Sequence, residues 1–147
     1  MFKIEKLTLK HINIEYFKLL SQLTVVNLDY LDQDKIKNFL LSLNEKHQVF
    51  VLIDDELNKV IGTITILIEH KLIRNFGIVG HIEDVVIDSN YRGKNLGKKI
   101  IDFAINYCNN KGCYKVILDC DEKNIGFYKK CGFKLKGFEM SLYFFTK

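Results

Sequence analysis

The segment YRGKNLGKK, at residues 91–99, carries the residue types and spacing most suited to binding chemistry. It follows the apolar run VVID at 85–88 and precedes the apolar run IIDFAI at 100–105, which belongs to a helix predicted to begin near Leu96. The first turn of a helix has unpaired amides and the positive end of the helix dipole, and a glycine-bearing turn lets a bulky anion approach them. The alternative is a tight strand-to-helix turn with a solvated basic face. We interpret the segment as a phosphate cradle.

Two common nucleotide-binding loops do not fit this segment. Gly93 and Gly97 have three residues between them, one fewer than G-x-x-x-x-G-K-[ST] requires, and Lys99 stands where a magnesium-binding hydroxyl would be. A dinucleotide-binding fingerprint needs three glycines as G-x-G-x-x-G, and only two are present.

Two adjacent acids, Glu83 and Asp84, lie inside an apolar run just before the basic segment. Side chains alternate along a strand, so we expect the two carboxylates on opposite faces and not as a pair on one face. Burying acids without partners is unfavourable, which favours a functional role. The alternative is one solvent-exposed acid and one acid paired with a lysine.

Composition excludes several classes of function. The four cysteines have no C-x-x-C spacing and form no ligand cluster with the four histidines, so we expect no metal site. The net charge of +4 permits an anionic small molecule or a weak nucleic-acid contact and requires neither. The basic residues have no aromatic stacking motif between them, which is unlike a nucleic-acid-binding surface. No apolar run reaches the roughly 18 residues of a membrane span, and the N-terminus lacks a signal-peptide core. We therefore expect a cytoplasmic protein with no nucleic-acid or membrane partner.

Hydrophobic periodicity predicts the elements that position these residues. Strands are predicted at 2–9, 49–54, 60–72, 76–88, 114–120 and 138–145, with 49–72 forming a hairpin. Helices are predicted at 11–23, from Asp32 or Asp34 to 47, from 96 to a C-cap at Gly112, and at 124–131 before Gly132. Strands 76–88 and 114–120 flank a helix, which predicts a right-handed parallel βαβ pair. We expect one α/β domain over residues 1–147, with a mixed, mostly antiparallel sheet and helices on both faces.

Sequence motifs then indicate a family. Residues 92–97, RGKNLG, resemble the R/Q-x-x-G-x-G/A pyrophosphate loop of the GNAT acyltransferases, with Asn95 in place of a glycine. Asparagine tolerates a left-handed backbone better than other non-glycine residues. NIGFYKKCGF at 124–133 resembles a later GNAT motif. The blocks IEHKLI…GHIEDVVID and GCYKVILDCDEKNIGFYKKCGF extend the resemblance over residues 68–133 to the glucosamine-6-phosphate N-acetyltransferases.

The resemblance implies a GNAT fold, acetyl-CoA as co-substrate without a metal, and direct acetyl transfer to the amine of glucosamine 6-phosphate. It implies Tyr128 as the general acid for the leaving thiolate, Asp119 as an acid that orients the amine or accepts its proton, and Glu83 as a further catalytic residue. Coenzyme A contacts are implied at Val85, Val86, Ile87, Arg92, Gly93, Lys94, Asn95, Leu96, Gly97, Lys98, Asn124 and Tyr128. Acceptor contacts are implied at Thr24, Lys71, Arg74, Glu83, Asp84, Tyr114 and Lys115.

The resemblance also implies a homodimer with a site at the two-fold interface, and the apolar LYFF near the C-terminus suggests an exchanged or packed terminal strand. An arginine that the family often has near its C-terminus, matched to the phosphate, is replaced here by Tyr143. Two other interpretations stay open at this point. One is a GNAT enzyme with a polyamine, another amino sugar or a protein N-terminus as acceptor. The other is a non-catalytic module that binds acyl-CoA or RNA.

Overall fold

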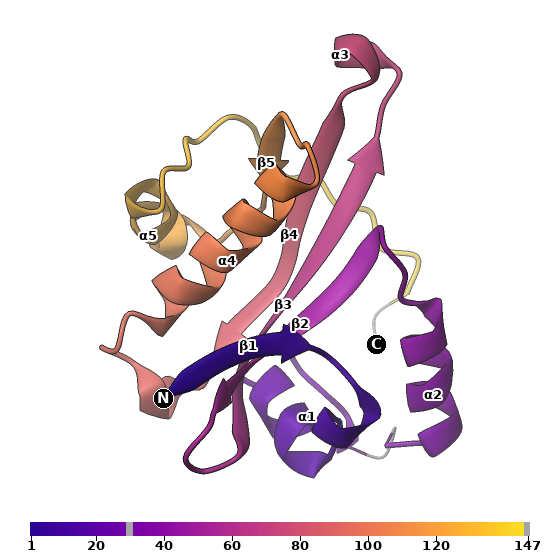
Figure 1. Ribbon diagram of the computed structural model, residues 1–147, viewed down its shortest axis with the longest axis vertical. Coiled ribbons are helices and arrows are strands. Elements are labelled where there is room, and N and C mark those ends of the chain that lie inside the picture. The colour runs from indigo at the N-terminus through magenta and orange to yellow at the C-terminus, as the bar shows by residue number, and fades with distance from the viewer. Residues whose placement is uncertain (29–30, 146–147) are drawn as a thin grey trace.

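A five-stranded mixed sheet forms the centre of the computed structural model, which describes residues 1–28 and 31–145 (Figure 1). The strands are β1 (Phe2–Lys6), β2 (His47–Asp54), β3 (Lys59–His70), β4 (Ile78–Ile87) and β5 (Lys115–Ile117), and they lie side by side in chain order. The first four pair antiparallel, and β5 pairs with β4 in parallel. The predicted hairpin and the predicted parallel βαβ pair are therefore confirmed.

Helices cover both faces of this sheet. One face carries the 3-10 turn η1 (Leu9–His11), α1 (Ile14–Leu20) and α2 (Gln33–Ser42); the other carries α4 (Leu96–Asn110), with α5 (Ile125–Lys130) after the 3-10 turn η4 (Glu122–Asn124). The 3-10 turn η3 (Ser89–Tyr91) links β4 to α4, and α3 (Ile73–Phe76) forms the tip of the β3–β4 hairpin. Gly112 and Gly132 follow α4 and α5 with φ angles of 82° and 100°, as the predicted C-caps require.

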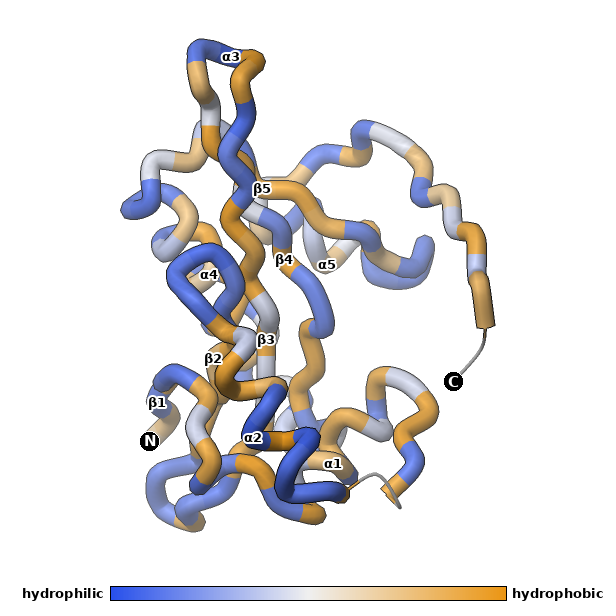
Figure 2. Tube along the Cα trace, turned by 90° about the vertical axis from the view of Figure 1, so that its right-hand side faces the viewer, coloured by the Kyte–Doolittle hydropathy of each residue, from blue (hydrophilic) through white to orange (hydrophobic). Residues whose placement is uncertain are grey.

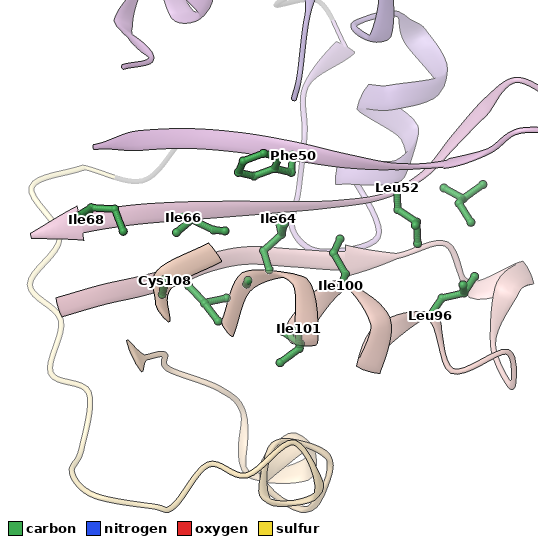
Figure 3. Close-up of a cluster of buried hydrophobic side chains, with 12 residues drawn as sticks. Phe50, Leu52, Ile64, Ile66, Ile68, Leu96, Ile100, Ile101 and Cys108 are labelled. Carbon is green, nitrogen blue, oxygen red and sulfur yellow. The ribbon is translucent and has the colours of Figure 1, made fainter. Parts of the chain in front are cut away.

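Two apolar clusters hold the helices to the sheet. The larger one joins Ile64 and Ile66 of β3 to Ile100, Ile101 and other residues along the inner face of α4 (Figure 3). Their side chains are fully buried, and this spacing is the i, i+1, i+4 pattern of one helix face. The smaller cluster lies beneath α1 on the opposite face. Alternating residues of β2 therefore serve both clusters: Phe50 and Leu52 belong to the larger one, and Val49, Val51 and Ile53 belong to the smaller one.

The largest departures from the predicted elements concern one helix and two strands. The helix predicted to reach residue 47 ends at Ser42, because Asn44 and His47 close a tight turn with two reciprocal backbone hydrogen bonds of 3.1 and 3.0 Å. The strand predicted at 114–120 covers Lys115–Ile117 only. Residues 138–145 form no strand: they pair with no sheet edge, and Phe138 and Met140 are 96% and 94% exposed. A strand exists only where it finds a partner strand.

No helix within residues 1–28 and 31–145 is long and apolar enough to cross a membrane.

Gly80 marks the tightest contact between the sheet and α4. A Cβ built on Gly80 overlaps Sγ of Cys108, a residue that is fully buried. We expect Gly80→Ala to lower the free energy of unfolding by about 1–3 kcal/mol, the usual cost of overpacking a filled core. Urea denaturation would measure the change.

Gly126→Ala is the matched control for this substitution. Gly126 lies inside α5 with no atom within 4 Å of its built Cβ, so alanine should leave the free energy of unfolding unchanged or raise it slightly. Cys108→Ala should restore part of the stability that Gly80→Ala removes, because it deletes the overlapped sulfur. Equal stability of the Gly80→Ala chain and the native chain would contradict the packing argument.

Candidate active site

The sheet opens between β4 and β5 partway along β4. The two strands pair only over Val79–Lys115, Gly80–Val116 and His81–Ile117. Beyond His81, β4 continues to Ile87 while still paired with β3 on its other edge. The main-chain groups of Val85–Ile87 on the β5 side therefore have no strand partner. A split of this kind offers backbone donors and acceptors to an extended ligand.

A β-bulge lies in β4 at the start of this split. Thr65 pairs with Glu83 and Thr63 with Val86, so β4 has one more residue than β3 between these pairs. Asp84 takes the extra position with φ of 51°, a left-handed conformation. Two residues on one strand thus oppose a single residue on the other.

The bulge overturns the expectation that Glu83 and Asp84 point to opposite faces. Glu83 is the partner of Thr65, and Asp84 lines a cavity of about 280 Å³ together with Thr65 and Tyr16. Both acids therefore lie on the face that α1 covers. The side chains do not alternate strictly at Asp84, because the left-handed residue is an extra position in β4 and shifts the alternation by one residue.

Glu83 has the electrostatic setting of a proton acceptor. Partial burial raises the pKa of its carboxyl group, and the nearby carboxylate of Asp119 raises it further. Asp84 and Glu139 act in the same direction, and His81 opposes them. A carboxylate with a raised pKa holds a proton more firmly, which brings it closer to what a general base needs near neutral pH.

Tyr128 lies across the opened end of the sheet, on α5. It lines a groove of about 700 Å³ that also contains Asp119. Its ring packs edge-to-face against Phe127 and Phe133, at centroid distances of 5.0 and 6.0 Å. Burial raises the pKa of the Tyr128 hydroxyl, with smaller effects from Cys120 and Cys131, so the group stays protonated across the neutral range and can donate.

The predicted phosphate cradle has the expected backbone geometry. Gly93 and Asn95 have left-handed φ angles of 79° and 58°, which supports the interpretation of Asn95 as a substitute for glycine. Within the described chain, the amides of residues 93–98 have no recorded acceptor, and the side chain of Asn95 does not cap α4. These amides are therefore available to an external anion at the N-terminus of a 15-residue helix.

The basic side chains around the cradle differ in availability. Lys98 pairs with Asp102 at 2.6 Å, one helical turn further along α4. Arg92 and Lys94 have no recorded carboxylate partner among residues 1–28 and 31–145. Phe127 packs over the start of α4, since a Cβ built on Gly97 would lie 3.2 Å from Cζ of Phe127. Gly97 thus lets α5 approach the cradle.

Other predicted acceptor residues lie at the far end of the β3–β4 hairpin. Lys71 pairs with Glu69 at 3.0 Å, and Arg74 lies at the exposed hairpin tip with φ of 57°. Tyr114 and Lys115 lie at the base of that tip, where the ring of Tyr114 would meet a side chain built on Gly77. Lys115 pairs with Val79, four residues before Glu83, which corresponds to about 14 Å along a strand. One chain therefore does not bring these residues to Glu83.

Two more predicted residues are exposed. Thr24 lies in the connection after α1, and its amide bonds to the carbonyl of Leu20 at 3.2 Å. Asn124 occupies the N-cap position of α5 but makes no side-chain capping hydrogen bond. Its side chain therefore remains available to a ligand.

Sequence reasoning missed two groups beside the acids. Glu139 of the C-terminal segment comes close enough to Glu83 to raise its pKa. Tyr16 donates or accepts a 2.9 Å hydrogen bond with Thr63 inside the cavity that Asp84 lines. Tyr16 lies at an apolar position of the helical pattern of α1, and this pattern predicts a core residue without indicating that its hydroxyl reaches the cavity. Among the described residues, no group of three or more His, Cys, Asp and Glu is arranged to hold a metal ion.

A split sheet, a β4 bulge and a glycine-bearing helix start are the features of an acyltransferase that binds its donor through main-chain groups. Residues 11–133 match the model of the Acetyltransferase (GNAT) family, and the chain belongs to this family. GNAT acetyltransferases use acetyl-CoA as co-substrate.

Two curated relatives are similar to this chain over most of its length. The chain is 43% identical to a glucosamine 6-phosphate N-acetyltransferase of Arabidopsis thaliana over 97% of each chain. It is 42% identical to glucosamine 6-phosphate N-acetyltransferase 1 of Dictyostelium discoideum, over 87% of this chain and 82% of that one. The crystal structure of the Arabidopsis thaliana enzyme superimposes with a TM-score of 0.88, covering 98% of this chain and 99% of that chain.

The proximity of Glu83 and Asp119 predicts a measurable coupling. Asp119→Asn removes a negative charge near Glu83, so the pKa of Glu83 should fall toward its usual value. A ¹³C-detected NMR titration of the Glu83 carboxyl group would measure the shift directly.

The control for this titration is Asp121→Asn. Asp121 lies in the exposed turn before η4 and is not among the groups that shift Glu83, so the titration should not move. An Asp119→Asn chain in which Glu83 titrates as in the native chain would show that the two carboxylates do not interact.

Proposed function

We propose that this chain is a glucosamine 6-phosphate N-acetyltransferase, with residues 1–147 acting as one catalytic domain in the cytoplasm. The curated relatives carry this name at 43% and 42% identity. The observation that carries the proposal is the arrangement of Glu83, Asp119 and Tyr128 around the open end of the sheet, next to a helix start with available amides.

Acetyl-CoA would lie in the split of the sheet. The diphosphate binds the amides between Gly93 and Lys98, with Arg92 and Lys94 supplying positive charge. The pantetheine arm runs along the free edge of Val85–Ile87 and forms main-chain hydrogen bonds there. Asn124 contacts the same co-substrate from the start of α5. This arrangement aims the thioester at the bulge in β4.

The chemistry needs one attack and two proton movements. The amine nitrogen attacks the thioester carbonyl, a C–N bond forms, and the C–S bond breaks. Asp119 orients the amine, and Glu83 accepts its proton, which its raised pKa favours. Tyr128 donates its hydroxyl proton to the departing thiolate, so that free coenzyme A leaves as the thiol.

The acceptor site requires a second chain in this proposal. Lys71, Arg74, Tyr114 and Lys115 lie too far from Glu83 within one chain to contact the same sugar. In a homodimer with two-fold symmetry, the hairpin tip of the partner can reach the site, and each chain serves the other in the same way. Asp84 and Thr24 line the sugar from the chain that holds the thioester.

The C-terminal segment supports this dimer. Phe138, Met140 and Phe144 are 96%, 94% and 89% exposed, and the last described residues extend away from the body of the molecule (Figure 2). Contiguous exposed apolar side chains of this size mark an interaction surface. The outer edge of β5 is unpaired in the described part of the chain, so a strand formed by this segment has a place to pair.

Acceptor selectivity tests the proposed activity. We expect thiol release from acetyl-CoA to be fast with glucosamine 6-phosphate and at least about 100-fold slower with glucosamine or spermidine, because a site built for a phosphate leaves its cations unpaired with other amines. A thiol-reactive dye would follow the release. Equal rates with the three acceptors would reject the sugar phosphate as substrate.

Tyr128→Phe provides the control for that assay. It keeps the ring packing against Phe127 and Phe133 but removes the proton donor. Binding of acetyl-CoA should persist while turnover falls about 100-fold or more, the usual contribution of a general acid. A chain that binds acetyl-CoA and never releases thiol would be a sensor and not an enzyme.

Mixed dimers test whether the site is shared. Arg74→Ala and Glu83→Gln chains carrying different tags can be co-expressed and the mixed dimer purified through both tags. Each variant alone should have low activity at limiting acceptor. The mixed dimer contains one site with both residues intact, so it should recover about half of the native activity. A mixed dimer as inactive as its parents would place both residues in one chain's site.

A further inference from the structure

Tyr91 comes immediately before the cradle, and both its hydroxyl and its ring contact strands β1 and β2 of the sheet. Its hydroxyl donates a 2.8 Å hydrogen bond to Oδ2 of Asp54, at the end of β2. Its ring packs edge-to-face against Phe2 of β1, with the centroids 6.1 Å apart. Phe2 and Asp54 are cross-strand partners, so a single rung of the sheet holds the ring and the hydroxyl together.

Asp54 is itself fixed in place. The residue is 8% exposed, and its other oxygen, Oδ1, accepts hydrogen bonds from the amides of Glu56 and Leu57 at 3.1 and 3.4 Å. The hydrogen bond from Tyr91 is the largest of the effects that lower the pKa of this carboxyl group. Asp54 is therefore ionised at neutral pH and acts as a strong acceptor for the tyrosine.

Lys94 rests on the same aromatic pair. Its Nζ lies 5.7 Å from the ring centroid of Tyr91 and 6.0 Å from that of Phe2, within the range of a cation–π interaction. No carboxylate partner is recorded for Lys94 in the described part of the chain. The two rings thus hold an ammonium group beside the cradle without neutralising its charge.

The turn itself has little else to hold it. No atom lies within 4 Å of a Cβ built on Gly93, so nothing packs against the residue that begins the cradle. A second anchor lies upstream, where Asp88 accepts hydrogen bonds from the amide of Asn90 at 3.0 Å and from Gln22 at 3.5 Å. Between Tyr91 and the buried Leu96, residues 92–95 are all exposed, so no side chain of this stretch packs into the body of the protein.

We propose that Tyr91 is a positioning residue for the co-substrate: its hydrogen bond to Asp54 and its packing on Phe2 fix the cradle backbone, and its ring holds Lys94 toward the diphosphate. This inference rests on the proposed binding of acetyl-CoA at residues 93–98. If the amides are already in position, the turn loses less conformational entropy when the co-substrate binds, and the affinity is higher. Tyr91 contacts neither the reacting atoms nor the acceptor in this scheme.

Tyr91→Phe tests the role of the hydroxyl, because it removes the hydrogen bond to Asp54 and keeps both ring contacts. We expect the KM for acetyl-CoA and the Kd for coenzyme A to rise roughly five-fold, the effect of one ordinary hydrogen bond, while kcat changes less than two-fold. With S-acetylpantetheine, which has no diphosphate, kcat/KM should stay at the native value. Isothermal titration calorimetry and thiol release measure these quantities.

Two further variants keep the test decisive. Asp54→Asn retains an oxygen for the turn amides but loses the charged acceptor, and it should give the same split between the two thioesters. Tyr107→Phe is the matched control on α4. The ring of Tyr107 packs against Phe50, and its hydroxyl makes no side-chain hydrogen bond within residues 1–28 and 31–145, so this variant should leave both thioesters unaffected.

The remaining outcomes separate the two proposals. If Tyr91→Phe binds coenzyme A as the native chain does, the positioning role is wrong and the proposed activity stands. If it weakens both thioesters equally and lowers Tm, Tyr91 has a structural role only. A native chain that binds no coenzyme A would overturn both the positioning role and the proposed function.

Discussion

The early end of the pairing between β4 and β5 is the constraint on which the rest of the structure depends. Three residue pairs hold these strands together, and β4 then continues alone beside β3. Full pairing would satisfy every main-chain group of β4 internally, and the sheet would have no opening for a ligand. The opening leaves main-chain groups of β4 without hydrogen-bond partners in the chain. Under the proposed function, an extended thioester forms these hydrogen bonds.

The bulge at Asp84 gives this opening its chemistry. A regular strand would direct Glu83 and Asp84 to opposite faces, with one of them among the apolar side chains beneath α4. The extra left-handed residue places both on the α1 face and returns Val85 to the apolar cluster of α4. The backbone distortion therefore separates two tasks: the acids lie on the α1 face, where the proposed acceptor would bind, and Val85 keeps the sheet packed on α4.

Much of this fold follows from local patterns in the sequence. The helical period of Ile100, Ile101 and Ala104 predicts α4, and its buried face is the one observed. The glycines at 112 and 132 predict the helix ends, because glycine is the usual residue after a helix. Both adopt positive φ in the structure, as this role requires. The cradle is equally local, because unpaired amides at a helix start follow from the helix alone. The left-handed conformation of Asn95 is also predictable, because asparagine tolerates this conformation better than other non-glycine residues.

The errors come from features that depend on a partner strand. EDVVI has the alternation of a regular strand, and nothing within it indicates a bulge, because a bulge is a mismatch in residue number against β3. The apolar pattern at 138–145 predicts a strand, but the pattern does not show whether the segment pairs, and within one chain it pairs with no strand. The roles of Lys71 and Arg74 stay predictions, because family resemblance indicates a shared site without indicating which chain contributes each residue.

The exposed C-terminal segment and the distant hairpin tip have a common explanation under the proposed function. The C-terminal segment has apolar side chains without a surface to cover them, and the hairpin tip has a basic residue far from the acids it was expected to join. Both are incomplete within one chain, and both would be completed by a second copy related by two-fold symmetry. In the proposed homodimer, a symmetric partner would cover the apolar segment and bring its cations to the acids in a single association. The exposed Phe138 supports this proposal through the burial of apolar surface, and Arg74 supports it through its distance from Glu83.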